Sequence, residues 1–225
     1  MAPQTFDQLA GRRVLAVCAH PDDESFGLGA VISTLVDLGA EVSVLCLTRG
    51  EASTLGSSPD LATTRVAELE SAALALGIRC VTVGHHADGA LPAVPLELLV
   101  TEVEAELRAA RADLMLAFDE GGITGHPDHE RATQAAVAVG VRRGVPVLAW
   151  AIAHRVAASL LAEFGVGFVG RDESDIDLVM PVARERQWAA IRCHASQSSE
   201  NPVLRRRMAL QDDVESLRWL VRPSS

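Results

Sequence analysis

Apolar and polar residues alternate along this chain in two different ways. Short runs of β-branched and other apolar residues predict buried strands, and the longer amphipathic stretches between them predict helices. The expected strands are residues 14–18, 42–47, 80–83, 114–118 and 147–152. The expected helices are residues 24–38, 61–76, 95–110, 128–143 and 155–164. Strands that are apolar throughout, each followed by a crossover helix, indicate a Rossmann-like, doubly wound α/β fold with helices on both faces of a mostly parallel sheet.

The alternation weakens after about residue 155. A glycine-rich turn, a strand-like stretch at residues 176–179 and two further helical segments follow. No linker, repeat or low-complexity segment separates this region from the rest. We therefore expect one domain over residues 1–225, with the last third as a C-terminal α/β extension.

Composition narrows the class of protein. With 225 residues, 48% of them hydrophobic, the chain can bury a core without disulfides or a structural metal. A formal charge of −10 argues against a nucleic-acid binder, which needs a basic face. The one basic cluster, Arg205-Arg206-Arg207, is interpreted as a solvated helix face.

The cysteines and the apolar runs bear on location. Four cysteines lie far apart and form no CxxC pair, so we expect reduced thiols and a cytoplasmic protein. The first 13 residues hold no apolar stretch of signal-peptide length, and no run approaches the roughly 20 residues that span a bilayer. We expect no membrane span; a homo-oligomer stays open.

Two loops that follow expected strands carry clusters of histidine and carboxylate. Ala19-His20-Pro21-Asp22-Asp23-Glu24 follows the first strand, and Gly125-His126-Pro127-Asp128-His129 follows the fourth. Ligands bind parallel sheets beyond the carboxyl ends of the strands, where the strand order reverses. In the common doubly wound order the first and fourth strands are neighbours at that point, so both clusters would face one crevice.

Each cluster offers metal ligands at helical spacing. His20 and Asp23 lie three residues apart, as do His126 and His129. Imidazoles with one carboxylate and an open position for water are the usual composition of a catalytic zinc site, and imidazole also suits other divalent transition metals. Spacing alone leaves both histidines of the second cluster open as ligands.

Two simpler interpretations of the clusters are weaker. The aspartates could merely cap helices, but a cap needs one carboxylate rather than Asp-Asp-Glu behind a histidine. A dinucleotide site would need three glycines in the first turn. Gly27-x-Gly29 lacks the third and falls inside the expected helix, and carboxylates in the turn would repel a pyrophosphate.

Together the two clusters resemble those of the LmbE-like (PIG-L) family of Rossmann-like zinc de-N-acetylases. The stretch that begins Arg65-Val-Ala-Glu68 is similar to the family's R-x-x-E helix, and His194-Ala-Ser-Gln197 resembles its H-x-S-Q motif. The matches run from about residue 14 to residue 197 in the family's order. The resemblance implies hydrolysis of an N-acetylglucosamine-type small molecule.

The resemblance also implies site residues. The metal ligands would be His20, Asp23 and His129, with water in the fourth place. Asp22 would be the general base on that water.

Three further roles follow from the same resemblance. His126 would stabilise the oxyanion and protonate the leaving nitrogen, and Asp128 would orient His126. Arg65 would reach a substrate hydroxyl or phosphate, unless it is a solvated residue of the first helical turn. Some relatives carry a tyrosine two residues before the first histidine of the second cluster; here that position is Thr124, and the chain has no tyrosine.

Other histidines carry less information. His85 and His86 would either contact substrate at the rim or lie exposed in a turn, and the second is favoured. His154 is expected to be structural, and an approach of His194 to the site is the less favoured option. The three tryptophans, at positions 150, 188 and 219, are expected in the core.

Three functions are weighed. The leading one is removal of an acetyl group from the amide nitrogen of an N-acetylglucosamine-type compound. The alternative is a hydrolase with the same metal chemistry acting on another amide or an ester. A catalytically silent binding module is disfavoured, because Asp22 and all three candidate ligands are present.

Overall fold

The structure is a computed structural model that describes residues 6–55, 60–199 and 201–223. One sheet runs through it in the order β3-β2-β1-β4-β5-β8-β7, with β6 paired to β5. Its strands are β1 (Arg13–Cys18), β2 (Glu41–Thr48), β3 (Cys80–His86), β4 (Leu114–Phe118), β5 (Val147–Ala153), β6 (Gly170–Arg171), β7 (Leu178–Pro181) and β8 (Val214–Val221). The α-helices are α1 (Asp23–Phe26), α2 (Gly29–Asp37), α3 (Leu61–Leu76), α4 (Leu96–Ala110), α5 (Gly122–Gly125), α6 (Pro127–Arg143), α7 (His154–Phe164), α8 (Glu185–Cys193), α9 (Ala195–Ser198) and α10 (Pro202–Gln211). Short 3-10 helices cover Phe6–Leu9, Leu91–Ala93 and Glu173–Asp175.

The first five strands are parallel and have the expected doubly wound order. β1 pairs with β2 on one side and with β4 on the other, so the strand order reverses between β1 and β4. The carboxyl ends of these two strands therefore share one edge of the sheet, as the sequence predicted.

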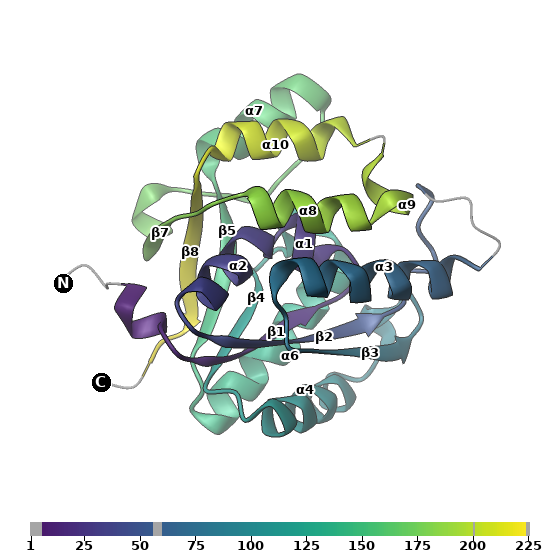
Figure 1. Cartoon of the computed structure of the whole chain (residues 1–225), viewed down its shortest axis with the longest axis vertical. Coiled ribbons are helices and arrows are strands. Elements are labelled where there is room, and N and C mark those ends of the chain that lie inside the picture. Colours follow the sequence, from purple (N-terminus) through teal and green to yellow (C-terminus); the bar gives the residue numbers. More distant parts are fainter. Residues whose placement is uncertain (1–5, 56–59, 200, 224–225) are drawn as a thin grey trace.

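Helices cover both faces of the sheet because β1 is apolar on both. Val14 and Ala16 of β1 belong to the core cluster that includes residues of α2, α3, α7 and α8. Leu15 and Val17, which alternate with them, belong to the cluster that includes residues of α4 and α6. Figure 1 shows α2, α3 and α8 on one side of the sheet and α4 and α6 on the other.

The helix expected over residues 24–38 is two helices. α1 ends at Phe26 and α2 begins at Gly29, so the chain changes direction at Gly27 and Leu28. A Cβ on Gly27 would lie 2.3 Å from the ring of Phe118 and 3.0 Å from that of Trp150. Close approach to these two rings explains why residue 27 is glycine. The sequence prediction of a continuous helix was wrong.

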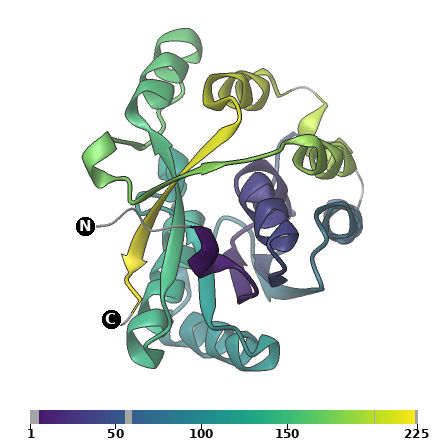
Figure 2. The same cartoon turned by 60° about the vertical axis from the view of Figure 1, so that its left-hand side comes forward.

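The C-terminal third adds strands to the same sheet. The sequence prediction did not include β8. β8 runs antiparallel to β5 and to β7, so the sheet is mixed at this edge. Figure 2 shows β8 (yellow) returning alongside β5 after α10. The extension contains α8, α9 and α10 where two helical segments were expected. A single domain over residues 1–225 stays a prediction.

Trp150 and Trp219 are buried in the core, as expected. Trp188 is half-buried and contacts a small cluster formed by Ile191, Leu204 and Met208. All four cysteines are free. No helix among the described residues is long and apolar enough to cross a membrane.

Candidate active site

A cavity of about 630 Å³ opens at the carboxyl ends of β1 and β4. Its lining falls into two groups, one polar and one largely apolar. The polar group is His20, Asp22, Asp23, Ser53, Arg65, Asp88, Thr124, His126, His129 and Gln197. The other group includes Phe26, Phe118, Ile123, Trp150, Phe168, Val203, Leu204 and Arg207.

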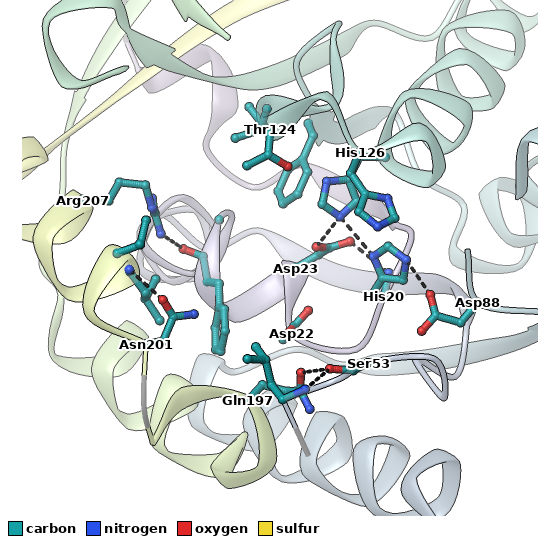
Figure 3. Close-up of a pocket in the computed structure, with 18 of the residues that line it drawn as sticks. His20, Asp22, Asp23, Ser53, Asp88, Thr124, His126, Gln197, Asn201 and Arg207 are labelled. Atoms are coloured by element: carbon teal, nitrogen blue, oxygen red, sulfur yellow. Dashed lines mark hydrogen bonds and ion pairs between the residues drawn. The ribbon is translucent and has the colours of Figure 1, made fainter. Parts of the chain in front are cut away.

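Contacts with His129 join the three expected metal ligands in this cavity. His20 Nδ1 lies 3.0 Å from His129 Nε2, which lies 3.2 Å from Asp23 Oδ1. Figure 3 shows His20 and Asp23 close together on the same side of the cavity. The loop after β1 carries His20, α1 begins at Asp23, and the first turn of α6 carries His129.

The remaining polar atoms of these side chains are held by the protein. The Nδ1–H of His129 faces the Gly122 carbonyl oxygen at 3.0 Å. Asp23 Oδ2 accepts hydrogen bonds of 2.9 Å from the backbone N–H groups of Ala19 and His20. His20 Nε2 lies 3.0 Å from Asp88 Oδ1 and 3.2 Å from Asp128 Oδ2. One donor atom each of His20, Asp23 and His129 is thus left to bind a metal.

These residues fit a divalent metal. Ligand atoms about 2.0–2.1 Å from zinc stand about 3.3 Å apart in a tetrahedral site, close to the spacings of 3.0 and 3.2 Å found here. Ring N–H groups fixed by carbonyl or carboxylate oxygens are the usual support of metal-binding histidines. Two groups of three potential ligands with atoms within 4.8 Å of one another share His20: one adds His126 and His129, and the other adds Asp88 and Asp128. Neither group includes Asp23, which contacts His129.

Neighbouring charges shift the pKa values of the residues in this cluster. Burial opposes a charge on His20, but hydrogen bonds to Asp128 and Asp88 raise its pKa to about 10. Burial also opposes a charge on Asp23, but the adjacent His129 outweighs it and lowers the pKa of that carboxyl. A bound divalent cation would displace a proton from this cluster.

Asp22 lies beside the cluster in strained backbone. Its φ of 138° and ψ of −21° belong to a region that residues other than glycine rarely occupy, a feature typical of functional sites. Burial raises the pKa of Asp22 to about 6, and the Arg65 guanidinium partly opposes this shift. The side chain of Asp22 keeps 17% of its surface exposed to the cavity side.

Arg65 is neither solvated nor free to reach outward. It is 3% exposed and donates hydrogen bonds to the carbonyl oxygens of Gly50 and Pro21. It also forms an ion pair of 3.0 Å with Asp22 Oδ2. The interpretation as a solvated helix residue was wrong, and the contacts make Arg65 a partner of Asp22.

His126 caps α6. Its Nδ1 accepts a hydrogen bond from the backbone N–H of Asp128, so the ring proton of the neutral imidazole lies on Nε2. Burial and the neighbouring His129 and His20 lower the pKa of His126. The ring centroids of His126 and His20 are 4.8 Å apart, so the Nε2–H is close to the candidate ligands.

The carboxylate of Asp128 has other partners than the expected imidazole of His126. It accepts hydrogen bonds from the backbone N–H groups of Gly89 and Leu91 and contacts His20 Nε2. These contacts orient His20 and anchor the loop after β3, so the structure does not support the orientation of His126 by Asp128.

Asp88 is a site residue that the sequence prediction missed. It precedes Gly89 and was interpreted as part of a turn, but its side chain forms an ion pair with His20. The available signal was its position, because it follows β3 at the same edge of the sheet as the two clusters.

The R-x-x-E helix and the H-x-S-Q motif contact each other and the cavity. Ser196 donates hydrogen bonds to Glu68 from its backbone N–H and its hydroxyl. Gln197 lines the cavity and accepts a hydrogen bond of 2.6 Å from Ser53. His194 is fully buried with its Nε2 2.7 Å from Glu24 Oε1, so it supports the cavity wall from behind.

The other histidines lie away from the cavity lining. β3 extends to His86, whose Nε2 contacts Glu102 of α4 at 2.8 Å, and His85 is exposed. His154 is exposed near Asp172 rather than part of the core.

Comparison with known proteins agrees with this geometry. A buried set of imidazoles and carboxylates at the switch point of a doubly wound sheet is suited to an enzyme that uses a divalent metal. Residues 15–139 match the family model described as PIG-L, GlcNAc-PI de-N-acetylase, and the chain belongs to this family of N-deacetylases. The 1D-myo-inositol 2-acetamido-2-deoxy-alpha-D-glucopyranoside deacetylase of Kineococcus radiotolerans is 30% identical over 83% of this chain and 69% of its own length.

Solved structures share the fold. The N,N'-diacetylchitobiose deacetylase from Pyrococcus horikoshii has a TM-score of 0.70 and 24% identity, over 98% of this chain and 88% of that one. GalB, the 4-carboxy-2-hydroxymuconate hydratase from Pseudomonas putida KT2440, has the same TM-score of 0.70 at 15% identity, over 94% of this chain and 97% of that one. The fold therefore hosts more than one chemistry, and the site must decide the reaction.

Proposed function

We propose that the protein hydrolyses the acetamido group of an N-acetylglucosamine-type small molecule with the help of zinc, and releases acetate and a primary amine. The observation that carries the proposal is the pair of contacts that His129 Nε2 makes with His20 Nδ1 and Asp23 Oδ1, while the other polar atoms of these side chains are held in place. The relative from Kineococcus radiotolerans is a deacetylase of a 2-acetamido-2-deoxyglucoside, which supports the substrate class.

His20, Asp23 and His129 would hold the ion. When bound, a divalent metal lowers the pKa of a water molecule to about 7 and polarises a carbonyl oxygen. Three protein ligands leave a position open for this chemistry, as in catalytic zinc sites. Other divalent transition metals suit the same ligands.

Asp22 is proposed as the general base. Its carboxylate lines the cavity beside Asp23, and the ion pair with Arg65 fixes it there. It accepts a proton from the attacking water as the new carbon–oxygen bond forms. Arg65 is held by two carbonyl oxygens and by Asp22. We therefore propose that it positions Asp22 rather than binding the substrate.

His126 is proposed to act opposite Asp22. Its Nε2–H can donate a hydrogen bond to the oxygen that becomes negative in the tetrahedral intermediate, an interaction worth about 3–4 kcal/mol in comparable sites. The proton that Asp22 has taken from the water then passes to the leaving nitrogen as the carbon–nitrogen bond breaks. Thr124 lines the cavity near this position, where some relatives have a tyrosine.

Asp128 and Asp88 are proposed to fix the ring of His20 through its Nε2 atom. Such partners of a ligand histidine typically matter 10- to 100-fold for metal affinity or activity.

The test combines metal analysis with detection of primary amine over a panel of N-acetylated sugars and an O-acetyl analogue. About one divalent metal per chain and amine release from an N-acetyl sugar are expected. Turnover of the O-acetyl analogue alone would support the alternative ester hydrolase. We also propose a cytoplasmic location, which the four free cysteines favour; whether the chain forms a homo-oligomer is a separate question for light scattering.

A further inference from the structure

The cavity continues away from the candidate metal ligands over a row of aromatic rings. The ring centroids of His129 and Phe118 are 4.9 Å apart, and those of Phe118 and Trp150 are 5.3 Å apart. The guanidinium carbon of Arg207 lies 4.9 Å from the centroid of Trp150. Figure 3 shows Arg207 at the opposite side of the cavity from His20 and His126.

Arg207 belongs to the triplet that the sequence indicated as a solvated helix face. Arg205 and Arg206 fit that interpretation, because both are exposed and Arg206 pairs with Glu163 of α7. Arg207 does not, because it is 4% exposed and lines the cavity. α10 thus places one of the three arginines inward.

The direct partners of the Arg207 guanidinium are neutral. It donates to the side-chain oxygen of Gln211 and to the backbone oxygen of Phe26, and its NH2 contacts Met208 Sδ. No carboxylate in residues 6–55, 60–199 and 201–223 lies within ion-pair distance of it. Burial lowers the pKa of Arg207 to about 10, and Glu215 partly opposes that shift.

Glu215 does not neutralise Arg207, because it is already paired. Its Oε1 forms an ion pair of 2.6 Å with Arg184, and its Oε2 accepts hydrogen bonds from Trp150 Nε1 and Gln211 Nε2. Two buried arginines therefore share one buried carboxylate. Arg184, Arg207 and Glu215 together carry a net charge of +1. Aromatic and aliphatic side chains surround them.

We infer that Arg207 binds an oxyanion of the substrate, a carboxylate or a phosphate, at the end of the cavity opposite the acetamido group. A buried cation without a charged partner is costly, and an anionic ligand in a low-dielectric pocket would offset that cost. The guanidinium fork matches both oxyanions in shape. The row of rings between the two ends fits the apolar face of a sugar or another flat group.

This inference rests on the proposed function only for the acetamido end of the substrate. The test uses three probes that share the acetamido sugar: the neutral methyl glycoside of N-acetylglucosamine, N-acetylglucosamine 1-phosphate, and N-acetylmuramic acid as the carboxylate. Binding is measured by calorimetry on chelator-treated, metal-free protein at low salt, so that phosphate cannot bind to a metal. Steady-state KM values with the metal-loaded enzyme form a second readout.

The wild-type protein should bind at least one of the two anionic probes about 10- to 100-fold more tightly than the neutral glycoside, as expected for hydrogen bonds to a charged group. Arg207→Met should remove this preference and leave the affinity for the neutral glycoside unchanged. Arg206→Met, an exposed arginine one residue away, should change neither. Arg207→Lys keeps the charge without the fork and should keep part of the preference.

Equal affinity of the wild-type protein for all three probes would overturn the inference, whether or not Arg207→Met folds. So would an equal loss for neutral and anionic probes in a folded Arg207→Met, since Arg207 would then only hold the backbone at Phe26. Absence of amine release from every probe would contradict the proposed function, while the binding data on metal-free protein would still decide the role of Arg207.

Discussion

Asp22 and Asp23 are adjacent carboxylates with different surroundings. Asp23 is held by two backbone N–H groups and faces His129, whereas Asp22 is paired with Arg65 and lines the cavity beside the cluster. Asp22→Asn should therefore retain the metal and lower kcat by on the order of 10²-fold or more, as loss of a general base does. Asp23→Asn should weaken metal binding. Metal content by atomic emission and kcat by amine release measure the two effects, and equal metal loss in both variants would mean that the roles are assigned wrongly.

His126 and His129 are distinguished by where their ring protons lie. His129 donates from Nδ1 to Gly122, which leaves Nε2 free to bind a metal, whereas His126 accepts at Nδ1 and carries its proton on Nε2. His129→Ala should lose metal in equilibrium dialysis. His126→Ala should retain it while kcat and kcat/KM fall together, as for an interaction made only in the transition state. If His126→Ala loses metal as readily, four protein ligands close the site and the oxyanion needs another donor.

The sequence predicted those site residues whose role depends on residues close to them in the chain. His20, Asp23 and His129 converge because two short motifs follow adjacent strands. The partners of Arg65 and the contact of Asp88 with His20 depend on which loops meet across the sheet edge. Neither follows from spacing along the chain, so the burial of Arg65 and the role of Asp88 were missed.

At the scale of elements, the break between α1 and α2 falls at one glycine. The Cβ of Gly27→Ala would meet the rings of Phe118 and Trp150, which are buried and cannot move freely. We expect a loss of about 1–3 kcal/mol in the free energy of unfolding, the usual effect of overpacking. Gly167→Ala is the control, because nothing lies within 4 Å of its Cβ position and the residue is exposed. Urea unfolding of both variants measures the difference, and similar midpoints would show that the rings give way.

The missed strand β8 illustrates why elements with a buried polar residue are hard to predict. Glu215, Leu217 and Trp219 alternate toward the interior, which is the period of a strand. The inward position of Glu215 looks polar in the sequence, so the alternation is hidden. The ion pair with Arg184 and the hydrogen bonds from Trp150 and Gln211 explain why a carboxylate is tolerated there.

At the scale of the whole molecule, the core does not depend on the metal. Two apolar clusters cover the two faces of the sheet, and the candidate ligands lie at its edge. Removal of the metal by a chelator should therefore abolish amine release and leave the far-UV circular dichroism spectrum and the cooperative unfolding transition largely unchanged. Global unfolding on chelation would show that the metal is structural.

The order of the parallel strands was predictable because it follows general rules of chain connection, and those rules also placed both clusters in one crevice. The far end of the cavity was not predictable, since it needs the return of β8 to bring α10 over the sheet. Which arginine of the triplet points inward is decided by the rotation of α10, and the sequence pattern of three consecutive arginines contains no such information.

The late return of the chain through α10 and β8 has a consequence for how enzymes of this shape can evolve. The candidate ligands and the base are all encoded before residue 130, whereas Gln197, Val203 and Arg207 are encoded in one short later stretch, residues 197–207. Mutations in that stretch can alter the far wall of the cavity without changing a single ligand. Selection for a new substrate can therefore act on a few neighbouring codons while the chemistry is inherited intact.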